Sequence, residues 1–354
     1  MINTFKDGKR FWDIKESENM KLDAIVGNPP YQILDGGNNA SAMPVYHHFI
    51  NVARLLKPSY ISMIMPSRWT VSGRGLDDFR KSMLDDHHLS KIFDFKNGGD
   101  CFPGIRIGGG VCYILWSILK NTENVEITNM PKSVESSSQI RPAKEFGLDF
   151  LIRDNTVRSI IHKVSKFDEK KMSALAFSQK PFGFRTNFTS FKNSGDVKIY
   201  TKKTNAGFAY VSRNDVEKNE KYIDEWQVVT SRSTSVPEED NGQVLRAVQT
   251  FICEPGAVVT ESYVVVASFD NEYEAGNCLN YLKTKFFRLL CQVTIVSPDV
   301  SARTFELVPQ QDFTSSSDIN WDVEVDDLDE QLFRKYNLAA NEIEFVKKQI
   351  KSIT

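Results

Sequence analysis

The sequence predicts an α/β protein, in which an open sheet with helices is followed by a mixed α+β domain and a short helical segment. Between residues 21 and 120, apolar strand-like runs alternate with helix-like segments such as residues 45–56, the pattern of an α/β sheet. The 354 residues are 41% hydrophobic, enough for two or three domains with their own cores. A stretch at 121–141, rich in Ser and Asn, predicts the exit from the first domain.

The first predicted strand ends in a double-proline turn. The apolar run at residues 24–26 leads into Asn28-Pro29-Pro30-Tyr31. Proline has a fixed φ and no amide hydrogen, and it also restricts the residue before it. The chain therefore leaves both strand pairing and helix at this point. The turn presents one side-chain amide, one free carbonyl and one aromatic ring.

These three groups suit the methylation of an exocyclic amino group on a base. The lone pair of an aromatic amine is delocalised into its ring, so the nitrogen needs acceptors that hold its hydrogens and favour a pyramidal geometry. The Asn28 side-chain oxygen and the Pro29 carbonyl are the candidate acceptors. Tyr31 is a candidate for stacking on the ring, a contact worth on the order of 1–3 kcal/mol. The alternative is a strand-terminating turn with a buried tyrosine, and the strand and glycine before the turn favour the functional interpretation.

The elements after the turn continue the α/β pattern. Residues 61–69 predict a second buried strand that ends in a turn, and residues 75–84 predict a helix. Residues 91–116 predict two apolar strands around a loop. The three glycines at 108–110 let this hairpin pass close to a ligand or to the sheet.

Together these motifs resemble the N6-adenine DNA methyltransferases of restriction-modification systems, in the type II class whose target-recognition domain follows the catalytic one. The shared order is strand, proline turn, helix, aromatic-bearing loop and β-hairpin. The resemblance implies that Asn28, Pro29, Pro30 and Tyr31 are catalytic, and that Tyr31 and Phe102 stack on opposite faces of an adenine flipped out of the duplex. The alternative for Phe102 is an ordinary loop phenylalanine that anchors residues 101–104 to the core.

The resemblance also implies the domain organisation. The fold is expected to be an incomplete Rossmann-like methyltransferase sheet at 1–125, an α+β target-recognition domain at 142–312 and a C-terminal helical tail at 313–354. Within the second domain, periodicity predicts a helix with Leu151, Val157, Ile161 and Val164 inward. Residues 261–269 predict a strand, residues 271–290 a helix, and residues 328–353 a short helical pair.

Charge is unevenly distributed along a chain whose net charge is −2. Residues 151–200 hold ten Lys and Arg against four Asp and Glu, a balance of +6, whereas residues 306–333 hold nine acidic residues and no basic one. The basic, aromatic-rich segment at 179–200 fits either a surface that meets DNA or a solvated surface over buried phenylalanines. The candidates for contacts with DNA are Arg106, Arg185, Asn187, Arg213 and Arg232, while Arg288 is as readily structural.

S-adenosylmethionine is the methyl donor that the resemblance implies. Its glycine-rich turn and ribose-binding acid would precede the Asn28 turn, and only 27 residues do so; no such loop follows residue 141 either. We therefore expect the carboxyl-terminal part of a methyltransferase without its donor-binding motif. A truncated or frame-split reading frame is favoured over a subunit of a split enzyme or a deliberately shortened chain.

Other features bound the function further. Five cysteines without a CxxC pair favour a reducing compartment, and the absence of a signal peptide or long apolar run favours a cytoplasmic protein without a membrane span. The adjacent pairs His47-His48 and His87-His88 are expected to diverge, so no metal site is predicted. The expected partners are double-stranded DNA and either a missing N-terminal half or a restriction nuclease. The open alternatives are a non-catalytic DNA-binding specificity module and methylation of a protein or RNA nitrogen.

Overall fold

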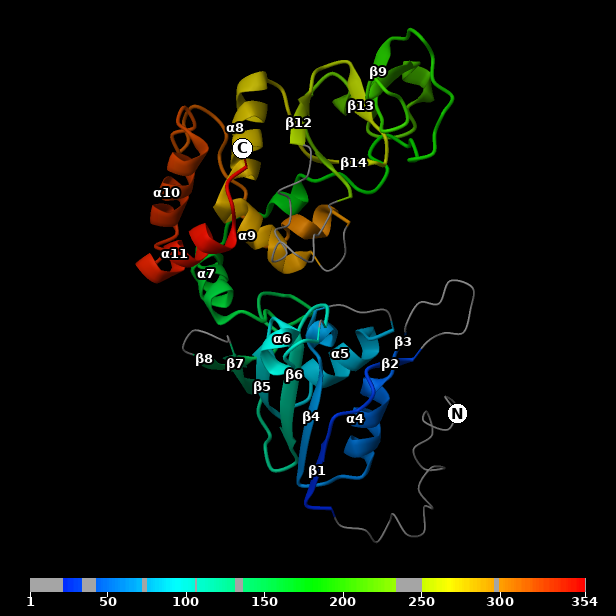
Figure 1. Cartoon of the computed structure of the whole chain (residues 1–354). Helices are drawn as coiled ribbons and strands as arrows, with labels where there is room; N and C mark the ends of the chain where they lie inside the picture. The colour runs from blue at the N-terminus through cyan, green and yellow to red at the C-terminus, as the bar shows by residue number, and fades with distance from the viewer. Residues whose placement is uncertain are drawn as a thin grey trace. The chain divides into compact units, whose positions relative to one another are not determined.

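The computed structural model describes residues 22–33, 43–71, 75–105, 107–130, 136–233, 250–295 and 299–353. The chain divides into two compact units, the first ending at Arg158 and the second beginning at Ser159 (Figure 1). The division into functional domains stays a prediction. No helix in the described ranges combines the length and the apolar character that a membrane span needs.

A mixed six-stranded sheet forms the centre of the first unit, in the order β1-β4-β6-β5-β7-β8. β1 pairs with β4 in parallel, as β5 does with β7, and the other neighbours are antiparallel. β1, β4, β5 and β7 therefore run in one direction, and their carboxyl ends lie at one edge of the sheet. The strands are β1 (Ala24–Gly27), β4 (Tyr60–Pro66), β5 (Leu89–Phe95), β6 (Val111–Ser117), β7 (Asn124–Asn129) and β8 (Ser137–Pro142).

Helices α4 (Tyr46–Leu55) and α5 (Asp77–Leu84) pack on this sheet, and the 3-10 turn η1 (Ser67–Thr70) follows β4. Their apolar residues join the inward side chains of the strands in one core, which includes Ile50, Phe79, Ile61, Met63, Ile92 and Ile114. The helices predicted at 45–56 and 75–84 and the hairpin predicted at 91–116 are confirmed. The fold is thus α/β with a mixed sheet, as expected.

Two features of the sheet differ from the sequence-based expectation. The stretch at 121–141 is not only an exit, because it supplies strands β7 and β8. Val125 and Ile127 are buried on β7 between more polar neighbours, so two apolar residues suffice to extend the sheet. β1 is the edge strand in the described part of the sheet, and 79% of the Val26 surface is exposed.

The second unit contains two three-stranded sheets, with the orders β10-β9-β13 and β12-β11-β14. The basic segment contributes its phenylalanines to the core between them, because Phe182 and Phe184 are buried while Phe188 and Phe191 pack against the same cluster. The phenylalanines thus follow the second of the two interpretations left open above. The strands are β9 (Val197–Tyr200), β10 (Phe208–Val211), β11 (Trp226–Ser231), β12 (Thr250–Cys253), β13 (Ala257–Val259) and β14 (Tyr263–Phe269).

Helices complete the second unit. The expected helix at 271–290 is two helices, since Thr284 is extended with ψ 149° and its hydroxyl caps the second by accepting from the amide of Phe287 at 3.1 Å. The strand predicted at 261–269 and the terminal helical pair are confirmed. The helices are α8 (Glu272–Lys283), α9 (Lys285–Thr294), α10 (Val325–Lys335) and α11 (Ala340–Gln349), with 3-10 turns η2 (Met172–Ala174), η3 (Arg213–Asp215), η4 (Glu220–Tyr222) and η5 (Ala302–Phe305).

Helix α7 (Asn155–Ser165) begins in the first unit and continues beyond the boundary at Arg158. Val157, Ile161 and Val164 are buried on it, as the periodicity predicted. Leu151 is also buried, but it lies before the helix. The predicted helix therefore starts four residues later than its apolar pattern suggests.

Candidate active site at the carboxyl ends of the parallel strands

The double-proline turn follows β1 directly and is fixed on both sides. β1 pairs with β4 up to Gly27. After the turn, the two-residue strands β2 (Gln32–Ile33) and β3 (Met43–Pro44) pair antiparallel, and the carbonyl of Tyr31 accepts from the amide of Val45 at 3.1 Å. The prolines interrupt the strand as predicted, and the chain resumes pairing immediately after Tyr31.

The two candidate acceptors of the turn, the Asn28 side chain and the Pro29 carbonyl, have no hydrogen-bond partner among the residues that the structure describes. Asn28 is exposed, whereas the ring of Pro29 is buried beneath the turn. Both lie at the carboxyl end of a parallel strand, the position at which open α/β sheets bind their ligands.

Tyr31 points inward from the turn and is half-buried. Its hydroxyl is shielded from solvent and has no hydrogen-bond partner among the described residues. Burial, followed by the influence of Cys101 and Cys112, raises the pKa of Tyr31 to about 12. The hydroxyl therefore lies within electrostatic range of Cys101, the residue that precedes Phe102 in the chain.

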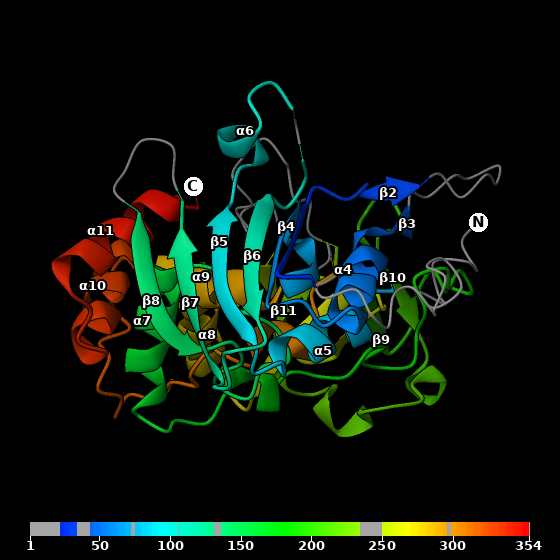
Figure 2. The same ribbon diagram turned by 90° about the horizontal axis from the view of Figure 1, so that it is seen from below.

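We call residues 96–110, of which position 106 lies outside the described residues, the Phe102 loop. It begins with the short helix α6 (Gly98–Cys101), in which the Asn97 side chain accepts from the amide of Gly99 at 3.0 Å. The amide of Phe102, itself half-buried, donates to the carbonyl of Gly98 at 2.8 Å. Figure 2 shows α6 and β2 at the same end of the sheet.

The loop returns to the sheet through Gly110. This residue has φ +80°, and a Cβ there would lie 2.2 Å from the carbonyl oxygen of Phe95. A side chain is excluded both by the backbone conformation and by the close approach. The glycines were expected to let the hairpin pass close to a ligand or to the sheet, and Gly110 shows the close passage to the sheet.

The histidines at the start of α4 differ from expectation. The ring centroids of His47 and His48 lie 3.9 Å apart, so the two side chains meet instead of diverging. Helical side chains lean toward the amino terminus, which lets neighbouring rings fold together here. Burial and the adjacent His48 lower the pKa of His47 to about 4, so its imidazole is neutral near pH 7. Among the described residues, no cluster of three or more His, Cys, Asp or Glu could hold a metal ion.

The predicted DNA contacts in the second unit fall into two groups. Arg185 and Asn187 are exposed in the segment after Phe184. Arg213 instead forms ion pairs with Asp224 and, at 3.5 Å, with Glu220, and Arg232 pairs with Glu261 at 2.7 Å. Two candidates thus remain available to a ligand and two are engaged.

The remaining arginines of the prediction lie elsewhere. Arg106 lies outside the described residues. Arg288 is fully buried, and its Nη1 donates to the carbonyl of Lys351 at 2.7 Å. Arg288 is therefore structural, one of the two roles considered for it.

Sequence reasoning missed a buried ion pair next to the Phe102 loop. Asp94, on β5, is 2% exposed and is bound by the guanidinium of Arg153. The available signal was an aspartate inside an apolar strand, which needs a partner when it is buried. The partner could not be identified from the sequence, since it is 59 residues away.

The donor-binding motif was expected before β1, and residues 1–21 lie outside those that the structure describes. β1 is the edge strand of the described sheet and leads straight into the Asn28 turn. The described residues therefore supply no strand beyond β1 from which a glycine-rich turn could hold the donor.

Comparison with known proteins relates the first unit to a family. Residues 1–102 match the family described as Eco57I restriction-modification methylase. The N-terminal part of this chain is similar to the Eco57I methylases. The chain is also 32% identical over 149 residues to an uncharacterized adenine-specific methylase of Mycoplasma pneumoniae, which covers 41% of this chain and 34% of that protein. The chain thus spans about a third of the length of that relative.

Two solved restriction-modification enzymes also share features with the chain. The type IIL enzyme MmeI, in complex with DNA, is 9% identical, with a TM-score of 0.46 over 99% of this chain and 54% of that one. The type IIG restriction endonuclease BpuSI is 14% identical, with a TM-score of 0.41 over 94% and 53% of the two chains. With TM-scores below 0.5, neither likeness extends the relation beyond the matched N-terminal residues.

Proposed function

We propose that this chain carries the target-amine part of a site-specific DNA methyltransferase that modifies N6 of adenine in a restriction-modification system. The observation that carries the proposal is a pair of acceptors at the carboxyl end of β1, the Asn28 side chain and the Pro29 carbonyl, that have no hydrogen-bond partner among the described residues. The match of residues 1–102 to the Eco57I restriction-modification methylases supports it.

The two acceptors act on the amine of the target base. The Asn28 oxygen and the Pro29 carbonyl each accept a hydrogen bond from the amino group, which draws the nitrogen lone pair out of conjugation with the ring. Tyr31 stacks on one face of the flipped adenine and Phe102 on the other, which offsets part of the few kcal/mol that extrusion of a base costs. The electrostatic influence of Cys101 on Tyr31 is consistent with this arrangement.

S-adenosylmethionine is the donor in this proposal, and its binding residues belong to a further part of the enzyme. Titration of the purified chain with S-adenosylmethionine tests it. Tight binding by the chain alone would show that the donor site is present after all.

Double-stranded DNA is the proposed substrate, and the second unit is the proposed recognition domain. Arg185 and Asn187 are exposed, which also favours the second candidate function, a DNA-binding specificity module without activity of its own. The two candidates differ in one respect, since only the enzyme requires Asn28.

The experiment is an Asn28→Ala replacement in the gene, in the cells that make the protein. Loss of a positioned hydrogen-bonding group lowers a rate by about 10²–10³-fold. We therefore expect N6-methyladenine to disappear from one sequence motif, as read by single-molecule sequencing of the genome. Asn51→Ala, an exposed asparagine on α4, is the matched control.

If every motif is methylated as before while the protein level is normal, the chain is not the methyltransferase. The DNA-binding specificity module would then be the remaining candidate function. Methylation that changes in protein or RNA, with DNA unaffected, would instead favour a different nitrogen substrate. Purified Asn28→Ala protein should still bind duplex DNA as the parent does, because Asn28 acts on the base after it is bound.

A further inference from the structure

A buried ion pair anchors the end of β5, where the Phe102 loop begins. The guanidinium of Arg153 binds the Asp94 carboxylate with two nitrogens, Nε at 3.0 Å from Oδ2 and Nη2 at 2.7 Å from Oδ1. The hydroxyl of Ser67 donates to Oδ1 at 2.7 Å. The buried carboxylate thus has a charged partner and a neutral donor, and a two-pronged pair of this kind fixes orientation as well as charge.

The third nitrogen of Arg153 reaches the far end of the Phe102 loop. Its Nη1 donates to the carbonyl of Gly109 at 2.6 Å. Next to this contact, the amide of Ser67 donates to the carbonyl of Gly110 at 3.0 Å. The returning arm of the loop is therefore tied to the same residues that hold Asp94.

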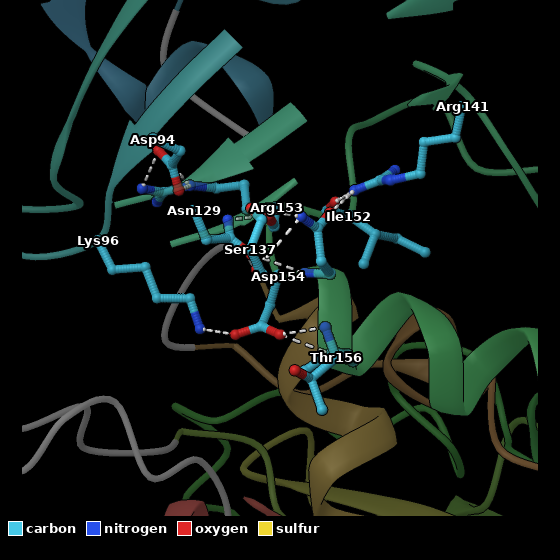
Figure 3. Close-up of polar contacts among 11 residues, drawn as sticks. Asp94, Lys96, Asn129, Ser137, Arg141, Ile152, Arg153, Asp154 and Thr156 are labelled. Atoms are coloured by element: carbon cyan, nitrogen blue, oxygen red, sulfur yellow. Dashed lines mark hydrogen bonds and ion pairs between the residues drawn. The ribbon is translucent and has the colours of Figure 1, made fainter. Parts of the chain in front are cut away.

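The starting arm of the loop is tied to the residue after Arg153. The Lys96 ammonium forms an ion pair with Asp154, and the other oxygen of Asp154 accepts from the amides of Thr156 and Val157 at 2.8 and 3.0 Å. Figure 3 shows Arg153 and Asp154 reaching Asp94 and Lys96 from the start of α7. Two consecutive residues therefore hold both arms of the loop.

Arg153 is itself held in place by its backbone. Its carbonyl accepts from the Asn129 side chain at 2.7 Å, and the Asn129 oxygen accepts from the amide of Asn155 at 2.8 Å. The guanidinium projects from a fixed point, so little further entropy is lost when all three nitrogens form hydrogen bonds. A lysine has a single ammonium group, so it could not bind both oxygens of Asp94 and also donate to the carbonyl of Gly109.

We propose that Arg153 is a positioning residue, which holds the Phe102 loop beside the Asn28 turn so that Phe102 meets the extruded base. Its link to the loop stands on the contacts above, and its link to the base rests on the proposed function. Arg153 does not touch the base and acts only through the loop.

The first test measures the loop without DNA or donor. In Arg153→Lys, the amides of the Phe102 loop should exchange hydrogen for deuterium about tenfold faster, the factor that corresponds to 1.4 kcal/mol. The amides of β6 should be unchanged. Arg158→Lys is the matched control, because Arg158 forms a comparable two-pronged pair with Glu145, at 3.0 and 2.5 Å, outside the loop.

Unchanged exchange in the loop of a folded Arg153→Lys protein would overturn the proposal. If that variant does not fold, Ser67→Ala removes only the hydroxyl bond to Asp94, and it should raise exchange in the loop by a smaller factor. Equal exchange rates of the loop amides in Ser67→Ala and in the parent protein would then contradict the proposal that these contacts hold the loop.

The second test is a double-mutant cycle on the rate at which the target motif is methylated after induction of the gene. Arg153→Lys should lower this rate about tenfold alone, but less than about twofold when Phe102 is already alanine, since coupled residues are non-additive. Equal losses in both backgrounds would overturn the positioning role. If the parent methylates no motif, the proposed function falls, while exchange still decides whether Arg153 holds the loop.

Discussion

Each unit buries an aspartate, and the two are neutralised in different ways. Asp94 in the first unit, 2% exposed, is bound by the guanidinium of Arg153 and the hydroxyl of Ser67. Asp329 in the second unit, 1% exposed, accepts from the amides of Lys285 and Phe286 at the start of α9, both at 2.9 Å. The first aspartate recruits a side chain that also reaches a loop, whereas the second is bound by the start of a helix, with the Lys285 ammonium 4.0 Å from its Oδ2.

The difference shows what each buried charge is for. A helix start needs an acceptor for its free amides wherever it lies, so the Asp329 contact is explained by α9 itself. The Asp94 contact has no such local cause, and Arg153 continues from it to Gly109. The buried aspartate of the first unit therefore helps to fix a loop beside the candidate site, whereas that of the second unit stabilises the start of a packed helix.

The largest effect is expected where the loop of the first unit meets the sheet. Gly110→Ala should lower the free energy of unfolding by about 3 kcal/mol or more, because backbone strain and a close approach act together. Gly256→Ala, in the second unit, is the matched control: it has φ +87° but no atom within 4 Å of an added Cβ, so about 1 kcal/mol is expected.

Chemical denaturation of the two variants measures both values. Equal losses of unfolding free energy would mean that the backbone around Gly110 and Phe95 adjusts to the added methyl group without a further loss of stability. In that case the loop would be less firmly fixed than the contacts of Arg153 indicate, and the contrast between the units would weaken.

The next effect is a dependence of stability on pH in the second unit. Burial raises the pKa of Asp329 to about 6, against about 3.9 in an unfolded chain. The folded state then binds this proton more tightly, so the stabilisation is fully present below about pH 4 and is lost as the pH rises through 6. The shift corresponds to about 3 kcal/mol. Asp329→Asn should remove this part of the pH dependence.

Denaturation between pH 4 and 7 provides the measurement, with Asp327→Asn as a control at an exposed acid of the same helix. A parent protein that gains stability relative to Asp329→Asn as the pH rises would show that the amides of α9 outweigh burial. Asp329 would then resemble a well-satisfied charge, as Asp94 does with its arginine.

The smallest effect concerns the surface of the second unit. Arg185→Ala should weaken binding of a duplex about fivefold, or about 1 kcal/mol, and should reduce the slope of binding against salt by about one counterion. Arg213→Ala should leave both quantities nearly unchanged, since Arg213 is already paired with Asp224. Fluorescence anisotropy at several salt concentrations distinguishes them. Equal losses in the two variants would show that ion pairing within the unit does not withhold an arginine from DNA.

Much of the candidate site could be predicted from local sequence. Two prolines after an apolar run forced the turn at Asn28, and two apolar strands around a glycine-rich segment predicted the Phe102 loop and its close return at Gly110. In each case the cause lies within a few residues of the effect. The family match to residues 1–102 covers the same region.

The supporting contacts could not be predicted, because they join distant residues. Asp94 and Arg153 are 59 positions apart, and Arg232 and Glu261 are 29 positions apart. Strand β7 was not predicted, because a strand at a polar surface can be defined by only two inward residues, here Val125 and Ile127. The break at Thr284 was hidden by an apolar pattern that continues through it.

The position of β1 has a consequence for handling the protein. Among the described residues it pairs on one side only, and Val26 presents 79% of its surface. An uncovered, apolar strand edge is a template for edge-to-edge association, which soluble proteins commonly block with a lysine or a proline. Here the proline comes only after the strand, at Pro29. If β1 keeps this free edge, we expect edge-to-edge association of the purified protein at high concentration, and Val26→Lys should reduce it.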